Sequence, residues 1–347
     1  MKATLRNAAV HALLICALLS GERAFAAEDG KSVYLLGATA SLAGLAPPPG
    51  TYVSVLQYLY SGDATGGAAL SRTLHQAGTT FPSVATLQTN ASLSVKADVA
   101  IDVVSALWVA PEKFLGGTFG FGALVPVGYQ KVNIDLTTLN TLTFPNGTTF
   151  QRGGFFNTSD NTFAVGDPLP TAFIGWNAGN WHWKLTAFVN VPIGSYNSAN
   201  LVNMGFNHWA GDLTGSVTWL DPASGCEVSL APGFTFNGEN PDTHYRSGTE
   251  FHLEGAVMKH FSKDFAVGIV GYHYQQVTGD SGSGAVLGPF KGEVSAIGPN
   301  LTYNFVIGSV PVLTSVRWLH EFDAKNRLQG DAGFLTATIP LGGAPAH

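Results

Sequence analysis

The stretch Val95-Lys96-Ala97-Asp98-Val99-Ala100-Ile101-Asp102-Val103 opens a run to Val109 that decides the fold of this chain. Its odd positions are mostly apolar, whereas its even positions include both acids and the lysine. Successive side chains of a strand point to opposite faces, so the run predicts a strand with one apolar and one charged face. It is longer than the ~5 to 6 residues of an ordinary strand and satisfies the ~10 residues of a tilted transmembrane strand.

The same alternation recurs along the chain. Trp181, Trp183 and Leu185 oppose His182 and Lys184, and similar patterns occupy 247–261 and 310–323. Strands are predicted near 51–62, 90–110, 118–135, 168–178, 181–195, 207–221, 225–238, 247–261, 264–278, 291–307, 310–323 and 326–340. The predicted fold is therefore all-β, a transmembrane antiparallel barrel of about twelve strands over residues 51–341.

The connections alternate in length. Short turns are predicted at 179–180, 221–225, 262–264 and 308–309, and longer polar loops at 62–89, 136–167, 196–206, 239–246 and 279–290. Short periplasmic turns and long outer loops are typical of outer-membrane barrels. Tryptophans near strand ends predict aromatic girdles at the membrane interfaces, except for Trp108, which the alternation places inward.

Composition narrows the class of protein. Of the 347 residues only 12% are charged. The net charge of −6 lacks the excess of basic residues that is typical of nucleic-acid-binding proteins. Residues 1–26 are predicted to be a signal peptide that is removed, with Lys2 and Arg6 before an apolar run at 8–19 that is too short to span a membrane. No second long apolar run follows, which excludes a helical membrane protein. The mature chain keeps one cysteine, Cys226, so it forms no internal disulfide.

The predicted signal peptide indicates Sec-type export. Together with the barrel pattern it predicts insertion into outer-membrane lipid with the help of barrel-assembly machinery. The last strand is followed by a short tail, 342–347, which lacks the terminal aromatic residue that such barrels commonly present for assembly.

Residues 27–50 form a separate N-terminal segment that is apolar and rich in Gly and Ala. It ends in Pro47-Pro48-Pro49, which cannot join a central ladder. One interpretation is a hatch in the lumen, with Leu35, Leu36, Leu42 and Leu45 as its apolar residues. The alternative is a short extra strand or a periplasmic lead-in.

Several phrases carry a family resemblance. They are Tyr34-Leu35-Leu36-Gly37, Gly166-Asp167-Pro168, Pro192-Ile193-Gly194-Ser195-Tyr196, Thr278-Gly279-Asp280-Ser281-Gly282 and Ile297-Gly298-Pro299. In their order and spacing they resemble the outer-membrane family "MetA-pathway of phenol degradation", which is similar to the channels for fatty acids and toluene-like hydrocarbons. The resemblance spans nearly the whole mature chain and implies a transport protein associated with aromatic catabolism.

Enzyme chemistry finds little support in the sequence. His260 and Ser262 are the closest His/Ser pair, but they lie at a predicted turn without a nucleophile-elbow motif. His252 between Glu250 and Glu254 is the only local cluster of metal-ligand types, and lumen hydrogen bonding explains it more simply. We therefore predict no catalytic residues, no metal and no cofactor.

The alternation of apolar and polar residues along the predicted strands indicates which side chains face the lumen, and these are the candidate site residues. The inward charges predict a lumen network or a selective eyelet, formed by Lys96, Asp98, Asp102, Glu250, His252, Glu254, Arg317 and Glu321. Tyr272, Tyr274 and Gln276 are candidates for contact with an aromatic permeant. The leading function is passive uptake of small hydrophobic or aromatic compounds. The alternatives are a general small-solute porin and a non-conducting structural or adhesive barrel whose loops 62–89 and 136–167 bind a partner.

Overall fold

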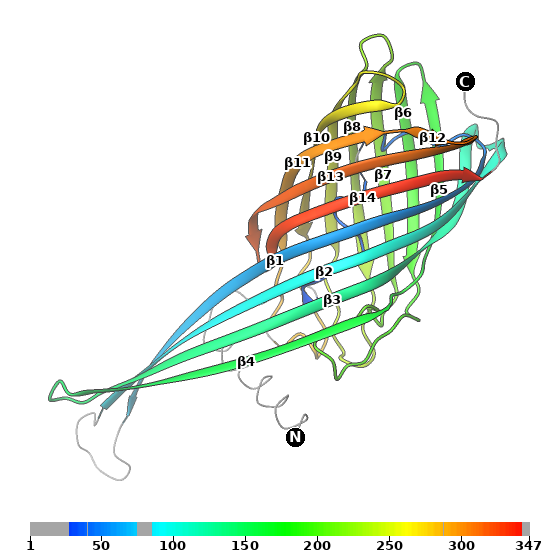
Figure 1. Ribbon diagram of the computed structural model, residues 1–347. Coiled ribbons are helices and arrows are strands. Elements are labelled where there is room, and N and C mark those ends of the chain that lie inside the picture. Colours follow the sequence, from blue (N-terminus) through cyan, green and yellow to red (C-terminus); the bar gives the residue numbers. More distant parts are fainter. Residues whose placement is uncertain (1–27, 40, 75–84, 287, 342–347) are drawn as a thin grey trace.

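The computed structural model describes residues 28–39, 41–74, 85–286 and 288–341 (Figure 1). The predicted signal peptide, the tail 342–347 and part of the loop 62–89 lie outside these ranges. One short 3-10 helix, η1 (Glu28–Gly30), precedes the strands. The strands are β1 (Gly50–Leu74), β2 (Ala85–Phe114), β3 (Gly117–Thr143), β4 (Thr149–Val165), β5 (Leu169–Ala178), β6 (Trp181–Asn190), β7 (Ala210–Asp221), β8 (Cys226–Asn237), β9 (Glu250–His260), β10 (Phe265–Gln276), β11 (Glu293–Tyr303), β12 (Phe305–Ile307), β13 (Val310–Lys325) and β14 (Gln329–Leu341).

The strands form one closed antiparallel sheet. β1 pairs with β2 on one side and with β14 on the other, and β11 pairs directly with β13, whose first residues also pair with the short β12. Twelve strands close the ring, because β4 and β12 lie outside the closing path. The predicted fold class is thus confirmed. Among the described residues no helix is long and apolar enough to cross a membrane.

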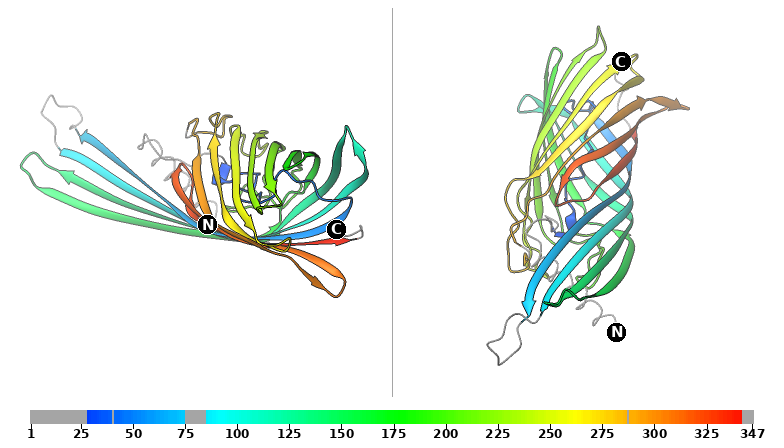
Figure 2. Two further views of the ribbon diagram at one scale, coloured as in Figure 1. Left: turned by 90° about the horizontal axis from the view of Figure 1, so that it is seen from above. Right: turned by 90° about the vertical axis from the view of Figure 1, so that its left-hand side faces the viewer.

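The two ends of the barrel differ. At one end short turns join β2 to β3, β5 to β6 and β7 to β8, with left-handed glycines at Gly116, Gly179 and Gly225. At the other end the loops are longer, and β1 to β4 continue far beyond the remaining strands as a projecting sheet (Figures 1 and 2). These ends are called the turn end and the loop end below.

The projecting sheet corrects part of the loop prediction. Residues 62–74, 85–89, 136–143 and 149–165, expected as loops, are strand residues of β1 to β4. β3 is long enough to pair with β5 over Thr118–Leu124 and with β4 over Val127–Thr143. These stretches are rich in Thr, Asn and Gly and lack clean alternation, yet Thr favours strands, and continuous pairing extends the ladder.

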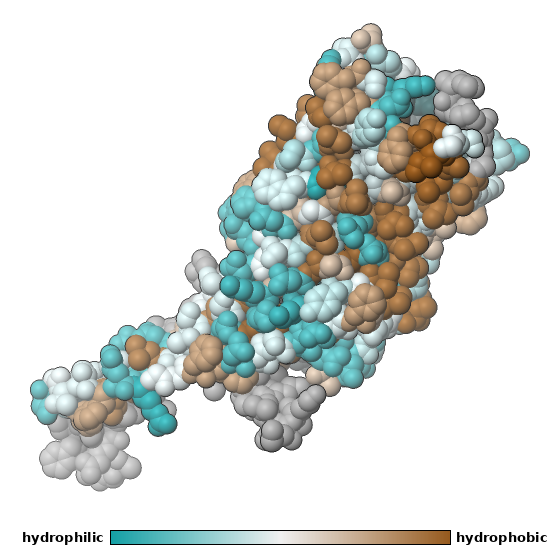
Figure 3. Space-filling model, in the orientation of Figure 1, coloured by the Kyte–Doolittle hydropathy of each residue, from teal (hydrophilic) through white to brown (hydrophobic). Residues whose placement is uncertain are grey.

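The outer wall of the barrel is apolar. On β6 the side chains of Trp181, Trp183, Leu185 and Val189 are exposed, while the residues between them turn inward. On β13, Val316, Trp318 and Phe322 are exposed while Arg317 and Glu321 are buried. Figure 3 shows apolar side chains over the visible barrel wall and mostly hydrophilic ones on the projecting sheet.

β2 reverses the predicted faces. Val95, Val99 and Ile101 line the lumen cavity described below, whereas on the outer face Lys96 and Asp98 are exposed and Asp102 is half-buried. Their assignment as lumen residues is therefore wrong. Alternation separates two faces but does not say which is inside, and here the apolar face is the inner one. By the same reversal Trp108 points outward, where its ring lies 5.3 Å from that of Phe121.

Candidate functional site

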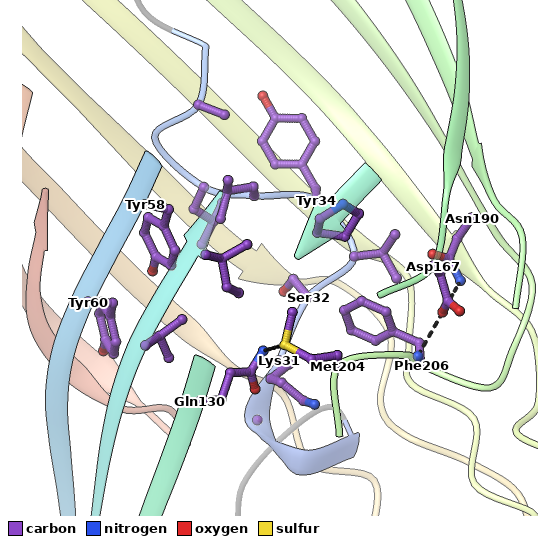
Figure 4. A pocket seen from close by; sticks show the side chains of 18 of the residues that line it. Lys31, Ser32, Tyr34, Tyr58, Tyr60, Gln130, Asp167, Asn190, Met204 and Phe206 are labelled. Atoms are coloured by element: carbon purple, nitrogen blue, oxygen red, sulfur yellow. Dashed lines mark hydrogen bonds between the residues drawn. The ribbon is translucent and has the colours of Figure 1, made fainter. Parts of the chain in front are cut away.

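A cavity of ≈930 Å³ occupies the lumen (Figure 4). Its β1 to β3 wall is largely apolar. The apolar members are Leu56, Tyr58, Val95, Ala97, Val99, Ile101, Val103, Leu124, Pro126, Val132 and Ile134, and the polar ones are Ser54, Tyr60, Ser105, Gln130 and Lys131. The opposite wall, from β5 to β7, is richer in hydroxyl groups and includes Thr171, Thr186, Thr214 and Ser216. Such a cavity offers a dry surface on one side and hydrogen-bonding groups on the other.

The N-terminal segment runs along this cavity from the loop end to the turn end. At the loop end the Glu28 carboxylate accepts hydrogen bonds from Asn240 Nδ2 at 3.0 Å and from the Thr243 hydroxyl at 2.6 Å. Halfway along, the Gly37 amide donates to the Glu254 carboxylate at 2.9 Å. The wall thus holds the segment at successive depths.

Glu227 on β8 holds the segment at the turn end. One carboxylate oxygen accepts from the Leu42 amide at 2.6 Å, and the other accepts from the Ser41 hydroxyl at 2.8 Å. Ser229 and His260 also hydrogen-bond to this fully buried carboxylate. Leu42 has a left-handed φ of 58°, so the chain turns tightly where Glu227 meets it.

Tyr34 anchors the middle of the segment. Its ring stacks on His252 with centroids 3.5 Å apart, and His252 Nε2 lies 2.9 Å from the Asp212 carboxylate. The Tyr34 hydroxyl donates to the Thr39 hydroxyl of the same segment at 3.2 Å. Leu36 joins the same buried cluster as Leu319 and Phe334.

A loop between β6 and β7 completes the cavity wall. Met204 and Phe206 of this loop border the cavity, and Gln130 Nε2 contacts Met204 Sδ at 3.1 Å (Figure 4). The buried Asp167 carboxylate organises the loop by accepting from Asn190 Nδ2 at 3.0 Å and from the Gly194 and Phe206 amides at 2.7 Å. Asp167, which lies between β4 and β5, therefore holds the loop between β6 and β7 in place.

A family model matches most of the chain. The model of the "MetA-pathway of phenol degradation" family matches residues 76–337. The chain belongs to this family.

One solved structure supports the fold of this family member. An outer membrane channel from Pseudomonas putida F1 is 15% identical, with a TM-score of 0.58 over 85% of this chain and 97% of that chain. A FadL homologue from Pseudomonas aeruginosa is 10% identical, with a TM-score of 0.39 over 92% of this chain and all of that one (100%). No curated protein matches the chain. At these identities the likeness concerns the fold.

The remaining candidate eyelet residues lie on the inner faces of β9 and β13, mostly away from the cavity surface. Glu250, His252, Glu254, Arg317 and Glu321 are all buried on the inner face, and of these only Glu321 borders the cavity. The Glu321 carboxylate accepts from the hydroxyls of Tyr60 and Tyr272 and from the Gly330 amide. Within the described residues no two of these five side chains form a hydrogen bond or ion pair with each other, so the network or eyelet stays a prediction.

The three candidate ligand contacts occupy different surroundings. Tyr272 borders the cavity, whereas Tyr274 lies beneath the Arg327 guanidinium, which is 4.1 Å from its ring centroid. Gln276 is fully buried and donates to Asp280 at 2.5 Å. Tyr274 and Gln276 are therefore removed from the cavity surface in this structure.

Of the candidate hatch residues, Leu35 and Leu36 border the cavity. Leu42 and Leu45 lie at the turn end, against Glu227 and Lys184.

Sequence reasoning missed three contributors to the cavity, which are Tyr58, Asp167 and the loop carrying Met204 and Phe206. Gly166-Asp167-Pro168 was a visible signal, since an acid between a glycine and a proline suits a specific turn. The pair considered for catalysis is engaged elsewhere. His260 binds Glu227, and the Ser262 hydroxyl accepts from the Asp264 amide at 3.1 Å.

Proposed function

We propose that this family member is an outer-membrane channel through which small hydrophobic or aromatic molecules diffuse passively. The observation that carries the proposal is the ≈930 Å³ lumen cavity with an apolar wall from β1 to β3. Pockets for small organic ligands commonly measure ~300 to 1,000 Å³ and are mostly apolar. The family description supports the aromatic character of the permeant.

The N-terminal segment, residues 27–50, is proposed to be the hatch of this channel. The wall contacts of Glu28, Gly37, Ser41 and Leu42 support the proposal, because they hold the segment inside the barrel of residues 51–341. Hydrogen bonds to a few carboxylates are more easily exchanged than a strand ladder. A hatch held in this way can shift without opening the barrel.

The exposed apolar outer wall supports insertion into outer-membrane lipid, with the turn end toward the periplasm and the loop end outside. The proposal includes Sec-type export and barrel-assembly machinery as the route to that membrane. It involves transport without catalysis. Tyr272 and Glu321 are proposed to form part of the selective wall, since both border the cavity.

Uptake by intact cells tests the proposal. Cells deprived of their own general porins, with and without this protein, would receive radiolabelled benzyl alcohol or radiolabelled raffinose. We expect the protein to raise initial uptake of the aromatic compound several-fold and to leave raffinose unchanged, because one wall of the cavity is apolar and the N-terminal segment occupies part of the lumen. Equal enhancement of both would indicate a general porin, and enhancement of neither would indicate a closed structural or adhesive barrel.

A further inference from the structure

Lys184 is a cation on the hydroxyl-rich wall of the cavity. It lies on the inner face of β6, next to Thr186 on the same strand and opposite Ser216 of β7. Its other cross-strand neighbour is Gly175 of β5, and Ala46 of the N-terminal segment occupies the space that a side chain at Gly175 would need. Lys184 therefore borders the cavity beside Leu45 and Ala46 of the N-terminal segment.

The positive charge of Lys184 has few stabilising contacts with other groups of the protein. Among the described residues its polar contact is a long hydrogen bond of 3.4 Å to the Leu45 carbonyl, and its Nζ lies 5.8 Å from the Phe173 ring centroid. No carboxylate of the described chain lies within ion-pair distance of it. A partly buried cation without an anion is costly unless a ligand or water supplies the missing contacts.

The carboxylates that border the cavity are, by contrast, occupied by donors of the protein. Glu28 is bound by Asn240 and Thr243, Asp167 by three donors, and Glu321 by two tyrosine hydroxyls and one amide. Carboxylates saturated with donors repel an incoming anion less than bare ones do. The electrostatic balance at the Lys184 end of the cavity therefore favours a negative group.

Hydroxyl residues neighbour Lys184 on the inner face, and two rings lie further along the same side of the cavity. Thr186 and Ser216 make no side-chain hydrogen bond within the described structure, so both hydroxyls are free to donate. Phe188, two positions beyond Thr186 on the inner face, stacks with Tyr34 at a centroid distance of 6.3 Å. An ammonium and two hydroxyls suit a carboxylate, and the adjacent rings suit an aromatic ring.

We propose that Lys184, Thr186 and Ser216 form a subsite that binds the carboxylate of aromatic acids, with the ring of the permeant against Phe188 and Tyr34. This inference rests on the proposed function and names the substrate class of the same cavity. One cation and two hydroxyls give modest affinity, which a passive route requires so that the permeant can leave.

Titration calorimetry of the full chain in detergent tests the subsite, with benzoate and benzamide as probes at neutral pH. The two probes share the ring and the planar substituent and differ in charge. We expect the wild type to bind benzoate about tenfold more tightly than benzamide, as one charge-assisted contact would give. Lys184→Met should abolish this preference, and Lys184→Arg should retain most of it.

Lys96→Met is the matched control, because Lys96 lies exposed on the outer face of β2. It should preserve the preference for benzoate. The inference is overturned if the wild type binds both probes equally or if Lys184→Met keeps the wild-type ratio; in either case binding of benzamide leaves the proposed function standing. Binding of neither probe overturns the proposed function together with the subsite.

Discussion

Replacing Glu227 with leucine is expected to raise the open probability of single channels in planar bilayers by at least about tenfold. Glu227 holds the N-terminal segment at the turn end of the barrel, where its carboxylate accepts from the Leu42 amide and the Ser41 hydroxyl. Hydrogen bonds to a charged group contribute ~1.5 to 3 kcal/mol each. Losing both should shift the equilibrium of the segment toward released states, because ~1.4 kcal/mol corresponds to a factor of ten.

Glu239→Leu provides the control for the Glu227 variant. Glu239 is an exposed carboxylate in the loop between β8 and β9, where it contacts His244 at 3.0 Å. The Glu239→Leu substitution removes a charge of the same sign, and within the described residues Glu239 does not contact the N-terminal segment. The open probability should therefore remain at the wild-type level. If Glu227→Leu folds, as judged by heat-modifiable mobility, and conducts like the wild type, residues 27–50 are not a hatch.

The second large effect is expected on stability. Asp167→Ala should lower the free energy of unfolding by ~3 to 5 kcal/mol, since it leaves three donors without their acceptor and each orphaned buried donor costs ~1 to 3 kcal/mol. Urea unfolding in detergent micelles, followed by tryptophan fluorescence, measures the change. The loop carrying Met204 and Phe206 should also become more sensitive to protease.

Asp160→Ala is the matched comparison for Asp167. Asp160 on β4 also binds the same loop, through the Leu201 amide at 2.9 Å, but this contact is exposed to solvent. Water can replace an exposed acceptor, so the expected loss is below ~1 kcal/mol. Equal losses for the two variants would show that burial of the Asp167 carboxylate does not organise the loop.

Alternation in the sequence predicted the barrel because long runs of period two occur where a wall separates two different environments. β6 and β13 behave as expected, with apolar residues outside and polar residues inside. β2 does not, because its inner face borders an apolar cavity while Lys96 and Asp98 lie toward the hydrophilic projecting sheet. The reversal reflects the same property that supports an apolar permeant.

The site was predictable only in part. Glu254 and Glu321 could be placed on inner faces by position along their strands, but their partners come from distant segments such as Gly37 and Tyr60. Asp167 organises residues that lie 23 to 39 positions further along the chain, and no local pattern encodes such contacts. The length of β1 to β4 escaped prediction because threonine-rich pairing continues beyond the segments that alternate.

The most direct test of permeation through the lumen uses one cysteine on each face of β2. In a Cys226→Ser background, Val99→Cys places a thiol in the cavity wall, and Val104→Cys places one on the exposed outer face. After complete labelling with a bulky thiol reagent, uptake of benzyl alcohol by porin-deficient cells should fall to the level without the protein for Val99→Cys and stay unchanged for Val104→Cys. Undiminished uptake through fully labelled Val99→Cys would contradict a route through the lumen.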